Sequence, residues 1–436
     1  MKNIVAIVLA AGEGTRMKSS LPKVLHQVCG KPMLAYILDA LRQMAIRKII
    51  VVVGHQAPKV KELLKNDREI TTVIQAALLG SGDAVWQARS ALSAFKGDVV
   101  VVYGDTPLVT HESLKNVIQS HQATGAACTL LAAVTKNPTG FGRIVRGDDN
   151  NVVQIVEEQE ADTFQKAIGE INVGVYCYNA RELFAALEQI KPDNKKNEYY
   201  LTDTIKILTA KKALVQAVST ADEQEALGIN SRQELVHANA VLNKRNIDLL
   251  LKSGVTVVSP ETTFVHADVE IGSDSVIYPH TIIESRVKIG QHCQIGPFAR
   301  LRSGSVLEDD VQIGNFVEIN RSKISSGTRI KHHSYIGDAL IGKNVNVGAG
   351  TITANYDGKN KNQTIIEDGA FIGVGTVLIA PVKIGRGALT GAGSVVTKGK
   401  NVPPGTVVAG VPAKVLNPKG RTQHSLKLGS KKARGG

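Results

Sequence analysis

The C-terminal half of the chain repeats an aliphatic residue every six positions. The series runs through Ile289, Ile295, Leu301, Leu307, Ile313 and Ile319, and it resumes at Ile366, Ile372, Leu378 and Ile384. Neither the 3.6-residue period of a helix nor the two-residue period of a lone strand gives this spacing, whereas a fixed repeat indicates a solenoid. Six residues make one short strand and one turn, so the pattern predicts a parallel β-helix whose aliphatic side chains point inward.

The repeat is interrupted in two ways, and a prism with flat faces is expected to carry its chemistry where the repeat breaks. The spacing shortens to five residues between Ile319 and Ile324 and again between residues 336 and 341. After Val347 it gives way to the polar stretch 351–358, which we expect to project as a loop. His332 and His333 lie between the two slips. A histidine there can act as a general base, although a surface pair can also be incidental.

Composition narrows the class of protein. The net charge is +13, but the stretch from residue 419 onward holds six basic residues and no acidic one, and the rest of the chain carries only +7. No basic patch is interleaved with aromatic residues, so nucleic-acid binding is not expected. The four cysteines form no C-x-x-C pair, which fits a reducing cytoplasm better than a disulfide framework. No stretch reaches the ~20 apolar residues that span a membrane.

The N-terminal half alternates apolar runs with helical stretches, which is typical of an α/β domain on a mostly parallel sheet. The apolar runs predict strands at 4–10, 48–53, 72–75 and 98–103, and the pattern between them predicts helices at 32–44 and 82–95. In such sheets, ligands bind beyond the carboxyl ends of the strands.

A long helix is predicted next, with Ser231 as its N-cap, Glu234 at the capping-box position and Gly254 after its end. This helix separates the two halves of the chain. The expected boundaries are residues 1–230 for the α/β domain, 231–252 for a helical linker, 253–414 for the β-helix and 415–436 for a basic, disordered tail.

A glycine-rich segment, L-A-A-G-E-G-T-R-M at 9–17, follows the first predicted strand, and Lys23 comes shortly after it. Glycines let backbone N–H groups approach phosphate oxygens, and Arg16 and Lys23 supply positive charge. A dinucleotide fingerprint would need glycine where Met17 stands, and a P-loop would need a G-K-[ST] sequence. The segment therefore predicts a phosphate-binding loop of another kind. A purely structural turn is the alternative that the two cations disfavour.

This segment is similar to the fingerprint of sugar-1-phosphate nucleotidyltransferases. Further motifs follow in the order of that family: Gln75, Gly80-Ser81-Gly82, Tyr103-Gly104-Asp105, residues 139–143 and residues 197–203. Together with the six-residue repeat, they make the chain before the tail resemble the GlmU family of bifunctional enzymes. The resemblance implies an α/β nucleotidyltransferase (Rossmann-like) domain followed by a left-handed parallel β-helix of hexapeptide repeats.

For the first domain, the resemblance implies uridylyl transfer from UTP to N-acetylglucosamine-1-phosphate, with release of pyrophosphate. It assigns the nucleotide to Gly12, Arg16, Lys23, Gln75, Gly80, Ser81 and Tyr103, the sugar to Gly140, Glu157, Asn172 and Asn230, and Mg²⁺ to Asp105 and Asn230. Such chemistry depends on positioning and on neutralising charge, and it needs no protein nucleophile. One departure is Leu78, which stands where the family often has a second uracil-contacting glutamine.

For the β-helix, the resemblance implies acetyl-CoA-dependent N-acetylation of glucosamine-1-phosphate in a homotrimer with sites between neighbouring subunits. The pattern H-x-[ST]-Y makes His332 the general base. The resemblance assigns the amino sugar phosphate to Arg302, Tyr335 and Asn346, and acetyl-CoA to Asn355, Tyr356, Val374, Ala392 and Gly410, with Asn355 also completing the amino-sugar pocket.

Three positions of this second site depart from the family pattern. Asn320 stands where a lysine usually binds the sugar phosphate, although Arg321 follows it directly. Val374 replaces a small polar residue near the thioester, and Gly410 stands where many members have a CoA-contacting arginine. One lost charge-assisted contact costs ~1.5–3 kcal/mol. The acetyltransferase is therefore expected to differ in efficiency or in substrate.

The predicted function is thus a bifunctional, cytoplasmic enzyme that makes UDP-N-acetylglucosamine, a precursor of bacterial envelope polymers. The alternative is a sugar-1-phosphate nucleotidyltransferase whose β-helix serves only oligomerisation or regulation. Five polar residues of the β-helix disfavour this alternative, because a scaffold does not need them: His332, Tyr335, Asn346, Asn355 and Tyr356. A non-catalytic assembly module would likewise have no use for Arg16, Lys23 and Asp105.

Overall fold

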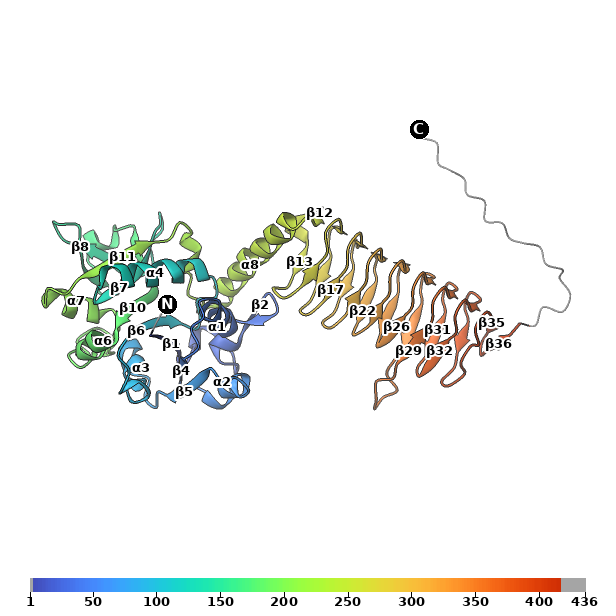
Figure 1. The fold of residues 1–436 in the computed structure, drawn as a ribbon, viewed down its shortest axis with the longest axis horizontal. Coiled ribbons are helices and arrows are strands. Elements are labelled where there is room, and N and C mark those ends of the chain that lie inside the picture. The colour runs from blue at the N-terminus through green and yellow to red at the C-terminus, as the bar shows by residue number, and fades with distance from the viewer. Residues whose placement is uncertain (1–2, 417–436) are drawn as a thin grey trace, which may run out of the picture. The chain divides into compact units, whose positions relative to one another are not determined.

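The computed structural model describes residues 3–416, and Figure 1 shows its fold. The expected basic tail lies outside the described residues, apart from its first two positions. The chain divides into two compact units, Met1–Arg245 and Asn246–Gly436, and passes from one to the other within one long helix.

The first unit is an α/β domain built on a nine-stranded sheet with the order β11-β7-β10-β6-β1-β4-β5, to which the hairpin β8-β9 is added through β10. The strands are β1 Ile4–Ala10, β4 Ile49–Val53, β5 Ile70–Ile74, β6 Asp98–Tyr103, β7 Cys128–Val134, β8 Arg143–Arg146, β9 Val152–Val156, β10 Glu170–Asn179 and β11 Val215–Ser219. The strands β1, β4, β5 and β6 are parallel, and β10 runs antiparallel to β6 and β7. The prediction of a mostly parallel sheet is confirmed.

Helices cover both faces of this sheet, because successive side chains of β1 point to opposite sides. Val5, Ile7 and Leu9 enter one buried cluster, and the alternating residues, such as Val8, enter the other. The helices are α1 Met33–Gln43, α2 Ala57–Leu64, α3 Ser81–Gln87, α4 His111–Thr124, α5 Thr163–Lys166, α6 Ala180–Leu187 and α7 Asp203–Ala210, and a small hairpin joins β2 Gln27–Val28 to β3 Lys31–Pro32.

The helix predicted over 82–95 is shorter in the structure. Helix α3 ends at Gln87, and a 3₁₀ turn follows at Ser90–Leu92. From Ala88 onward the backbone N–H groups bond to carbonyls three residues back, as in the 3.0 Å bond from Ala88 to Val85. This tighter winding stops the α-helix.

Helix α8, Arg232–Lys252, begins with the predicted capping box. The Ser231 hydroxyl accepts from the Glu234 N–H at 3.3 Å, and the Glu234 carboxylate accepts from the Ser231 N–H at 2.7 Å. Gly254 follows the helix with a φ of 87°, a left-handed conformation that glycine adopts without strain.

The second unit is a left-handed β-helix made of three sheets, which we call the first, second and third faces, and their strands are parallel except for the last one, β36. The first face holds β12 Thr256–Val257, β15 Val276–Ile277, β18 Gln294–Ile295, β21 Gln312–Asn315, β24 Arg329–His332, β27 Asn346–Val347, β30 Phe371–Ile372, β33 Leu389–Thr390, β35 Val407–Gly410 and β36 Ala413–Val415. The second holds β13 Phe264–Val265, β16 Ile282–Ile283, β19 Arg300–Leu301, β22 Glu318–Asn320, β25 Tyr335–Gly337, β28 Ile352–Ala354, β31 Val377–Ile379 and β34 Val395–Val396. The third holds β14 Glu270–Ile271, β17 Lys288–Ile289, β20 Val306–Leu307, β23 Lys323–Ile324, β26 Ala339–Ile341, β29 Thr364–Ile366 and β32 Val382–Ile384.

The six-residue aliphatic series forms the interior of this prism, as predicted. All ten of its members belong to one buried cluster. The register gives the length of each coil. Ile295 pairs with Ile313 across a regular coil of three hexads. Ile313 pairs with Ile330, and Ile330 with Val347, so each of these two coils is one residue shorter. Val347 then pairs with Ile372, and the coil between them is lengthened by an insertion.

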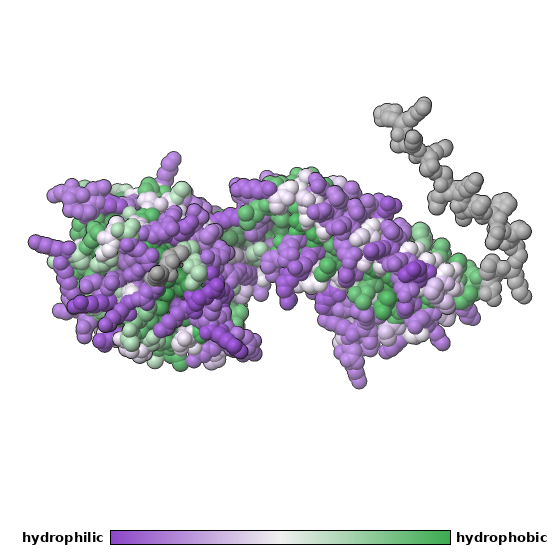
Figure 2. Space-filling view, viewed as in Figure 1, coloured by the Kyte–Doolittle hydropathy of each residue, from purple (hydrophilic) through white to green (hydrophobic). Residues whose placement is uncertain are grey.

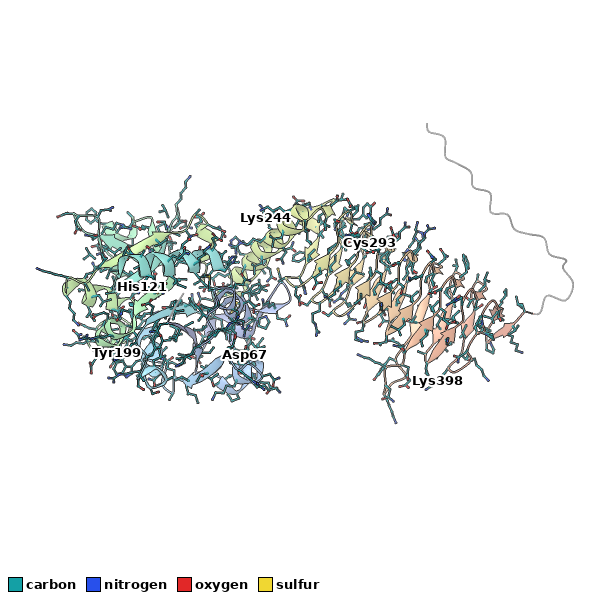
Figure 3. All side chains as sticks on the ribbon, in the orientation of Figure 1. Asp67, His121, Tyr199, Lys244, Cys293 and Lys398 are labelled. Atoms are coloured by element: carbon teal, nitrogen blue, oxygen red, sulfur yellow. The ribbon has the colours of Figure 1, made fainter. Side chains whose placement is uncertain are left out.

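The loop predicted at 351–358 begins later than expected. Ile352–Ala354 form β28 and pair with β31, and the side chain of the central residue, Thr353, is fully buried. The hydroxyl of Thr353 donates to the carbonyl of Gly337 at 3.1 Å, which explains how a polar residue can replace an aliphatic one inside the prism. The projecting segment is therefore 356–363. Lys398, labelled in Figure 3, approaches its Asp357 with an Nζ–Oδ2 distance of 3.7 Å.

The packing of the prism predicts that two neighbouring residues of one short strand contribute very differently to the free energy of unfolding. Ile295 is fully buried, whereas Gln294 before it points outward. We expect Ile295→Ala to lower the free energy of unfolding by about 2–5 kcal/mol, because it leaves a cavity between packed coils. Gln294→Ala is the matched control and should change stability by less than about 0.5 kcal/mol. Urea unfolding followed by circular dichroism measures both, and equal losses would contradict the packing described.

Candidate active sites

The first cleft opens at the carboxyl ends of strands β1 and β6 and has a volume of about 760 Å³. Eleven of the twelve residues that the sequence analysis assigned to the first domain line it: Gly12, Arg16, Lys23, Gln75, Gly80, Ser81, Tyr103, Asp105, Gly140, Glu157 and Asn230. They come from segments far apart in the chain, and the parallel sheet brings them together because its strands end at one edge.

The glycine-rich segment after β1 turns sharply beside Lys23. Gly14 has a φ of 66°, and a Cβ atom at this position would lie 2.8 Å from Cβ of Lys23. Only glycine fits there without strain or displacement. The turn places Gly12 and Arg16 on the wall of the cleft, so that a backbone without side chains and a cation face the same space.

Lys23, Asp105 and Asn230 form the charged centre of the cleft. The ammonium group of Lys23 forms an ion pair with the Asp105 carboxylate and donates to Oδ1 of Asn230 at 2.8 Å. Asp105 follows β6, and Asn230 precedes helix α8, so two oxygen acceptors from distant segments converge on one cation. The backbone N–H of Ile229 donates to the carbonyl of Asp105 at 2.9 Å and ties the two segments together.

At one end of the cleft, the turn of Gly80 and Ser81 is anchored to the segment 199–201. The backbone N–H of Leu201 donates to the Ser81 hydroxyl at 3.0 Å. Tyr103 packs against Gly174, where a Cβ atom would lie 2.9 Å from the ring, and burial raises the pKa of its hydroxyl. Tyr103 therefore remains a neutral hydrogen-bonding group.

At the other end, Gly140 and Glu157 face the cleft. Burial raises the pKa of Glu157, whose carboxylate accepts from the hydroxyl of Thr202 at 3.0 Å. Glu158 holds the Gly140 loop, since its carboxylate accepts from the N–H of Gly140 at 2.9 Å and pairs with the buried Arg143 at 2.7 Å. These bonds lower the pKa of Glu158, the bond from Gly140 most.

Asn172 is the predicted residue that does not line the cleft. Its Nδ2 donates to the hydroxyl of Tyr176 at 2.7 Å, and its Oδ1 accepts from the N–H of Gly174 at 3.1 Å. It lies on β10, and the ladder between β10 and β7 shifts register after it. Both ends of the amide are therefore engaged in shaping the bulged strand.

Sequence reasoning assigned no role to several polar residues that line the cleft: Glu13, Glu158, Gln159, Lys196, Glu198 and Tyr200. Lys196 adds a third cation to the walls. Its only signal was its position directly before the quoted motif 197–203. Tyr200 lies within that motif, and burial raises its pKa to about 12.

The second site lies on the prism, around the two shortened coils. His332 ends β24, and its Nδ1 donates to Oδ1 of Asn315 at 3.0 Å. The two residues are register partners in adjacent coils. His333 follows at the corner, and its ring stacks on Phe316 with the centroids 4.9 Å apart. Asn315 and Phe316 thus hold both histidines, and no described residue forms a hydrogen bond with the Nε2 atom of His332.

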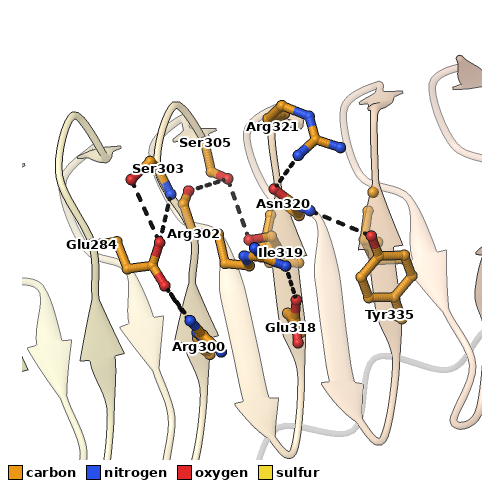
Figure 4. Close-up of polar contacts among 12 residues, drawn as sticks. Glu284, Arg300, Arg302, Ser303, Ser305, Glu318, Ile319, Asn320, Arg321 and Tyr335 are labelled. Carbon is orange, nitrogen blue, oxygen red and sulfur yellow. Dashed lines mark hydrogen bonds and ion pairs between the residues drawn. The ribbon is translucent and has the colours of Figure 1, made fainter. Parts of the chain in front are cut away.

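A row of polar side chains crosses the second face, as Figure 4 shows. Arg302 donates to Glu318 at 3.0 Å, and Nδ2 of the buried Asn320 donates to the hydroxyl of Tyr335 at 3.4 Å. Leu301 and Ile319 are register partners. Arg302 and Asn320 therefore occupy equivalent positions in consecutive coils, about 4.8 Å apart.

Arg321 extends this row at the next corner. Its guanidinium donates to Oδ1 of Asn320 at 2.9 Å and to both oxygens of Asp338 at 2.7 and 2.8 Å. Asp338 also accepts from Nδ2 of Asn355. The bond to Arg321 is the main cause of the lowered pKa of Asp338. Gly337 lies beneath, where a Cβ atom would be within 3 Å of both Tyr335 and Asn355, so Tyr335 and Asn355 converge on one small space.

Three of the residues predicted for acetyl-CoA, Val374, Ala392 and Gly410, stack at one corner of the prism in consecutive coils. A Cβ atom on Gly373 would lie 2.9 Å from the backbone nitrogen of Ala392, and the N–H of Gly393 donates to the carbonyl of Val374 at 2.7 Å. Gly410 ends β35 at the same corner in the next coil, with a φ of 100°. Asn346 lies on the first face, paired with Arg329 and Phe371. Tyr356 is 61% exposed on the projecting loop.

Comparisons with known proteins agree with this architecture. Residues 5–225 match the family model described as nucleotidyl transferase, and residues 286–321 and 363–398 match the model described as bacterial transferase hexapeptide (six repeats). Curated relatives match nearly the whole chain, and they are named bifunctional protein GlmU. The relative from Heliobacterium modesticaldum is 45% identical over 93% of this chain and 95% of its own length, and that from Oceanobacillus iheyensis is 45% identical over 92% and 95%. The relative from Shouchella clausii is 42% identical over 91% and 94%.

The chain belongs to the GlmU family. As a GlmU family member it is an enzyme that combines a nucleotidyltransferase with a hexapeptide-repeat acetyltransferase, and the sequence prediction of both is confirmed. No helix within residues 3–416 is both long and apolar enough to cross a membrane.

The Arg321–Asp338 pair of this GlmU family member makes stability depend on pH. Because the folded pKa of Asp338 is lowered, its contribution is present above its unfolded pKa of about 3.9 and is lost as the pH falls through the folded value. We expect Asp338→Asn to cost about 1 kcal/mol of unfolding free energy at pH 7 and progressively less below pH 4. Urea unfolding at pH 7, 5 and 3 measures this. A cost that is constant over the three pH values would contradict the ion pair.

Proposed function

We propose that the two sites catalyse consecutive steps: acetyl-CoA-dependent N-acetylation of glucosamine-1-phosphate on the prism, and uridylyl transfer from UTP to N-acetylglucosamine-1-phosphate in the first cleft. The observation that supports this best is the convergence of Lys23, Asp105 and Asn230 in one cleft and of His332 and the row from Arg302 to Asp338 on one prism. A scaffold needs neither group.

In the first cleft, the cations Arg16, Lys23 and Lys196 would bind the triphosphate and the sugar phosphate, while Gly140 and Glu157 would hold the sugar. The phosphate oxygen of N-acetylglucosamine-1-phosphate attacks the α-phosphorus of UTP, the bond to the β-phosphate oxygen breaks, and pyrophosphate leaves. Both substrates are anionic, so the residues contribute chiefly alignment and positive charge.

Asp105 and Asn230 would hold Mg²⁺ in this scheme. Their two oxygens already converge on the ammonium group of Lys23, and Mg²⁺ typically takes one or two protein oxygens together with phosphates and water. The donor set therefore fits. When bound, the ion would neutralise the phosphate charge that develops during transfer, and Lys23 would be freed to contact a phosphate.

The two activities should be separable by mutation at Asp105. We expect Asp105→Ala to reduce pyrophosphate release from UTP by 100-fold or more, a loss of about 3 kcal/mol of transition-state stabilisation, and to leave acetylation unchanged. Coupled phosphate detection and thiol release from acetyl-CoA report the two reactions. Pyrophosphate release at the wild-type rate would remove Asp105 from the metal site. Loss of both activities would contradict independent sites.

On the prism, Nε2 of His332 would accept the proton as the amine of glucosamine-1-phosphate attacks the thioester carbonyl. The bond from carbon to nitrogen forms, the bond to sulfur breaks, and the CoA thiol leaves. Asn315 supports this role, since its amide oxygen keeps the proton on Nδ1 and leaves Nε2 free to act as a base. Tyr335, Asn346 and Asn355 would hold the amino sugar, and Val374, Ala392 and Gly410 would lie along acetyl-CoA.

The phosphate of glucosamine-1-phosphate would lie between Arg302 and Arg321. Asn320 cannot supply the charge of the lysine that is usual in the family, but Arg321 is bonded to Asn320 and stands one residue further along the same corner. Two N–H groups of its guanidinium are not used by Asp338 or Asn320, and its side chain is 38% exposed. The positive charge that the family usually has at position 320 would thus be supplied by the next residue, Arg321.

His332 and His333 provide a matched pair for testing the second reaction. We expect His332→Ala to lower kcat for acetylation by 10²- to 10⁴-fold, the usual contribution of a general base, with little effect on uridylyl transfer. His333→Ala removes a ring that stacks on Phe316 at the same corner and should lower kcat by less than tenfold. Thiol release from acetyl-CoA measures both. Equal effects of the two variants would remove His332 from the role of base.

The prism also supports a homotrimer. On the first face of its last coils the outward residues are apolar: Phe371, Leu389 and Val407 stack in register and are 47%, 36% and 40% exposed. Ile352 on the second face is 44% exposed. Figure 2 shows hydrophobic surface over these coils. Such faces are typical of subunit interfaces. The four free, buried cysteines support the proposed cytoplasmic location.

A further inference from the structure

The amide of Gln75 is held by two acceptors at the end of the first cleft that Gly80 and Ser81 form. The side chain is 4% exposed. Its Nε2 donates to the carbonyl oxygen of Gly80 at 3.0 Å and to Oδ2 of Asp83 at 2.7 Å. An amide nitrogen carries two hydrogens, so both are used. No described residue donates to Oε1 of Gln75, and the residue lines the cleft.

The orientation of this amide follows from chemistry alone. A backbone carbonyl and a carboxylate can only accept hydrogen bonds. Exchanging the oxygen and nitrogen of the Gln75 amide would place Oε1 against two acceptors and leave two buried groups without donors. Bonds to a charged acceptor are the stronger ones, so Asp83 contributes more to the preference than Gly80 does. The oxygen of Gln75 is therefore the atom presented to the cleft.

The two acceptors are themselves fixed. Oδ1 of Asp83 accepts from Nε2 of Gln87 at 2.9 Å, one turn further along α3. The turn that carries Gly80 is bound to Tyr199, which Figure 3 labels, because the N–H of Gly82 donates to the Tyr199 carbonyl at 2.7 Å. A Cβ atom on Gly80 would lie 2.6 Å from the same carbonyl oxygen. Asp83 and the carbonyl of Gly80 therefore cannot readily turn away from Gln75.

An obligatory acceptor distinguishes the two pyrimidines. The ring atom N3 carries a hydrogen in uracil but a lone pair in cytosine. With the base in one pose, Oε1 of Gln75 accepts from uracil N3–H, whereas cytosine would place two lone pairs against each other. Leu78, which also lines the cleft, has no polar atom in its side chain to share this task. The discrimination between uracil and cytosine therefore depends on Gln75.

We propose that Asp83 is a specificity-determining residue, which selects uracil over cytosine by holding Gln75 with its oxygen toward the nucleobase. This rests on the proposed uridylyl transfer in the first cleft. Asp83 is a positioning residue, because it acts through Gln75 and does not itself line the first cleft.

The test compares kcat/KM for pyrophosphate release from UTP and from CTP with the full-length protein. In Asp83→Asn, the new amide can donate to Oε1 of a rotated Gln75, whose nitrogen then faces the base and suits cytosine. We expect the UTP-to-CTP ratio to fall about tenfold, because Gly80 still favours the native orientation. Asp83→Ser, which removes the charge with a smaller side chain, should also lower the ratio.

Two further variants separate this effect from general damage. Gln87→Leu removes the other partner of Asp83 but keeps both bonds of Gln75, and should leave the ratio within twofold of the wild type. Gln75→Ala removes the acceptor itself and should lower the ratio at least as much as Asp83→Asn. Acetylation by the prism and circular dichroism confirm that each variant is folded.

The outcomes distinguish this inference from the proposed function. A ratio unchanged in both Asp83 variants but lowered in Gln75→Ala would overturn the role of Asp83. A ratio unchanged in Gln75→Ala as well would show that the base is not recognised by this amide. If the wild-type chain releases no pyrophosphate from UTP when N-acetylglucosamine-1-phosphate and Mg²⁺ are present, the proposed function itself fails. A loss of activity toward UTP and CTP in equal proportion counts against specificity.

Discussion

The inward column of aliphatic side chains fixes the geometry of the prism, and the second site depends on it. Each coil must return a buried and mostly aliphatic side chain to the same interior position, so any change in coil length has to be absorbed at a corner. Coils of three full hexads give a regular surface. His332, Asp338 and Asn355 lie in the two shortened coils and in the lengthened coil that follows them. The core thus determines where polar groups can gather.

In the α/β unit, the sheet determines where polar groups can gather. Its central strands β1, β4 and β6 are buried on both sides, and polar groups gather at the strand ends. Asp105 follows β6, the Gly12 segment follows β1, and the turn at Gly80 follows β5. Side chains from these ends then hold one another: Lys23 pairs with Asp105 and Asn230, and Gln75 bonds to Asp83. Each orientation is set by a partner that accepts or donates only.

Departures from a family pattern acquire meaning only with their neighbours. Asn320 lacks the charge of lysine, but the structure bonds it to Arg321 and places it level with Arg302 in the preceding coil. Leu78 lacks the amide of a second glutamine, but Gln75 is held by two acceptors. In both cases we propose that a residue beside the altered position supplies the missing interaction. A position-by-position comparison would have scored each as a loss.

The sequence by itself determined the six-residue repeat, the mostly parallel sheet, the capped helix after Ser231 and eleven of the residues that line the first cleft, because periodicity and motif spacing are local properties. It placed the start of the loop at 351 and the end of a helix at 95 wrongly, since Thr353 finds a buried acceptor and the backbone after Gln87 winds more tightly. Only the tertiary structure decided that the amide of Asn172 bonds to Tyr176 and Gly174, that Asn315 orients His332, and that Asp83 orients Gln75. These partners are separated by loops or coils of different length, and their distances follow from register and packing rather than from spacing in the chain.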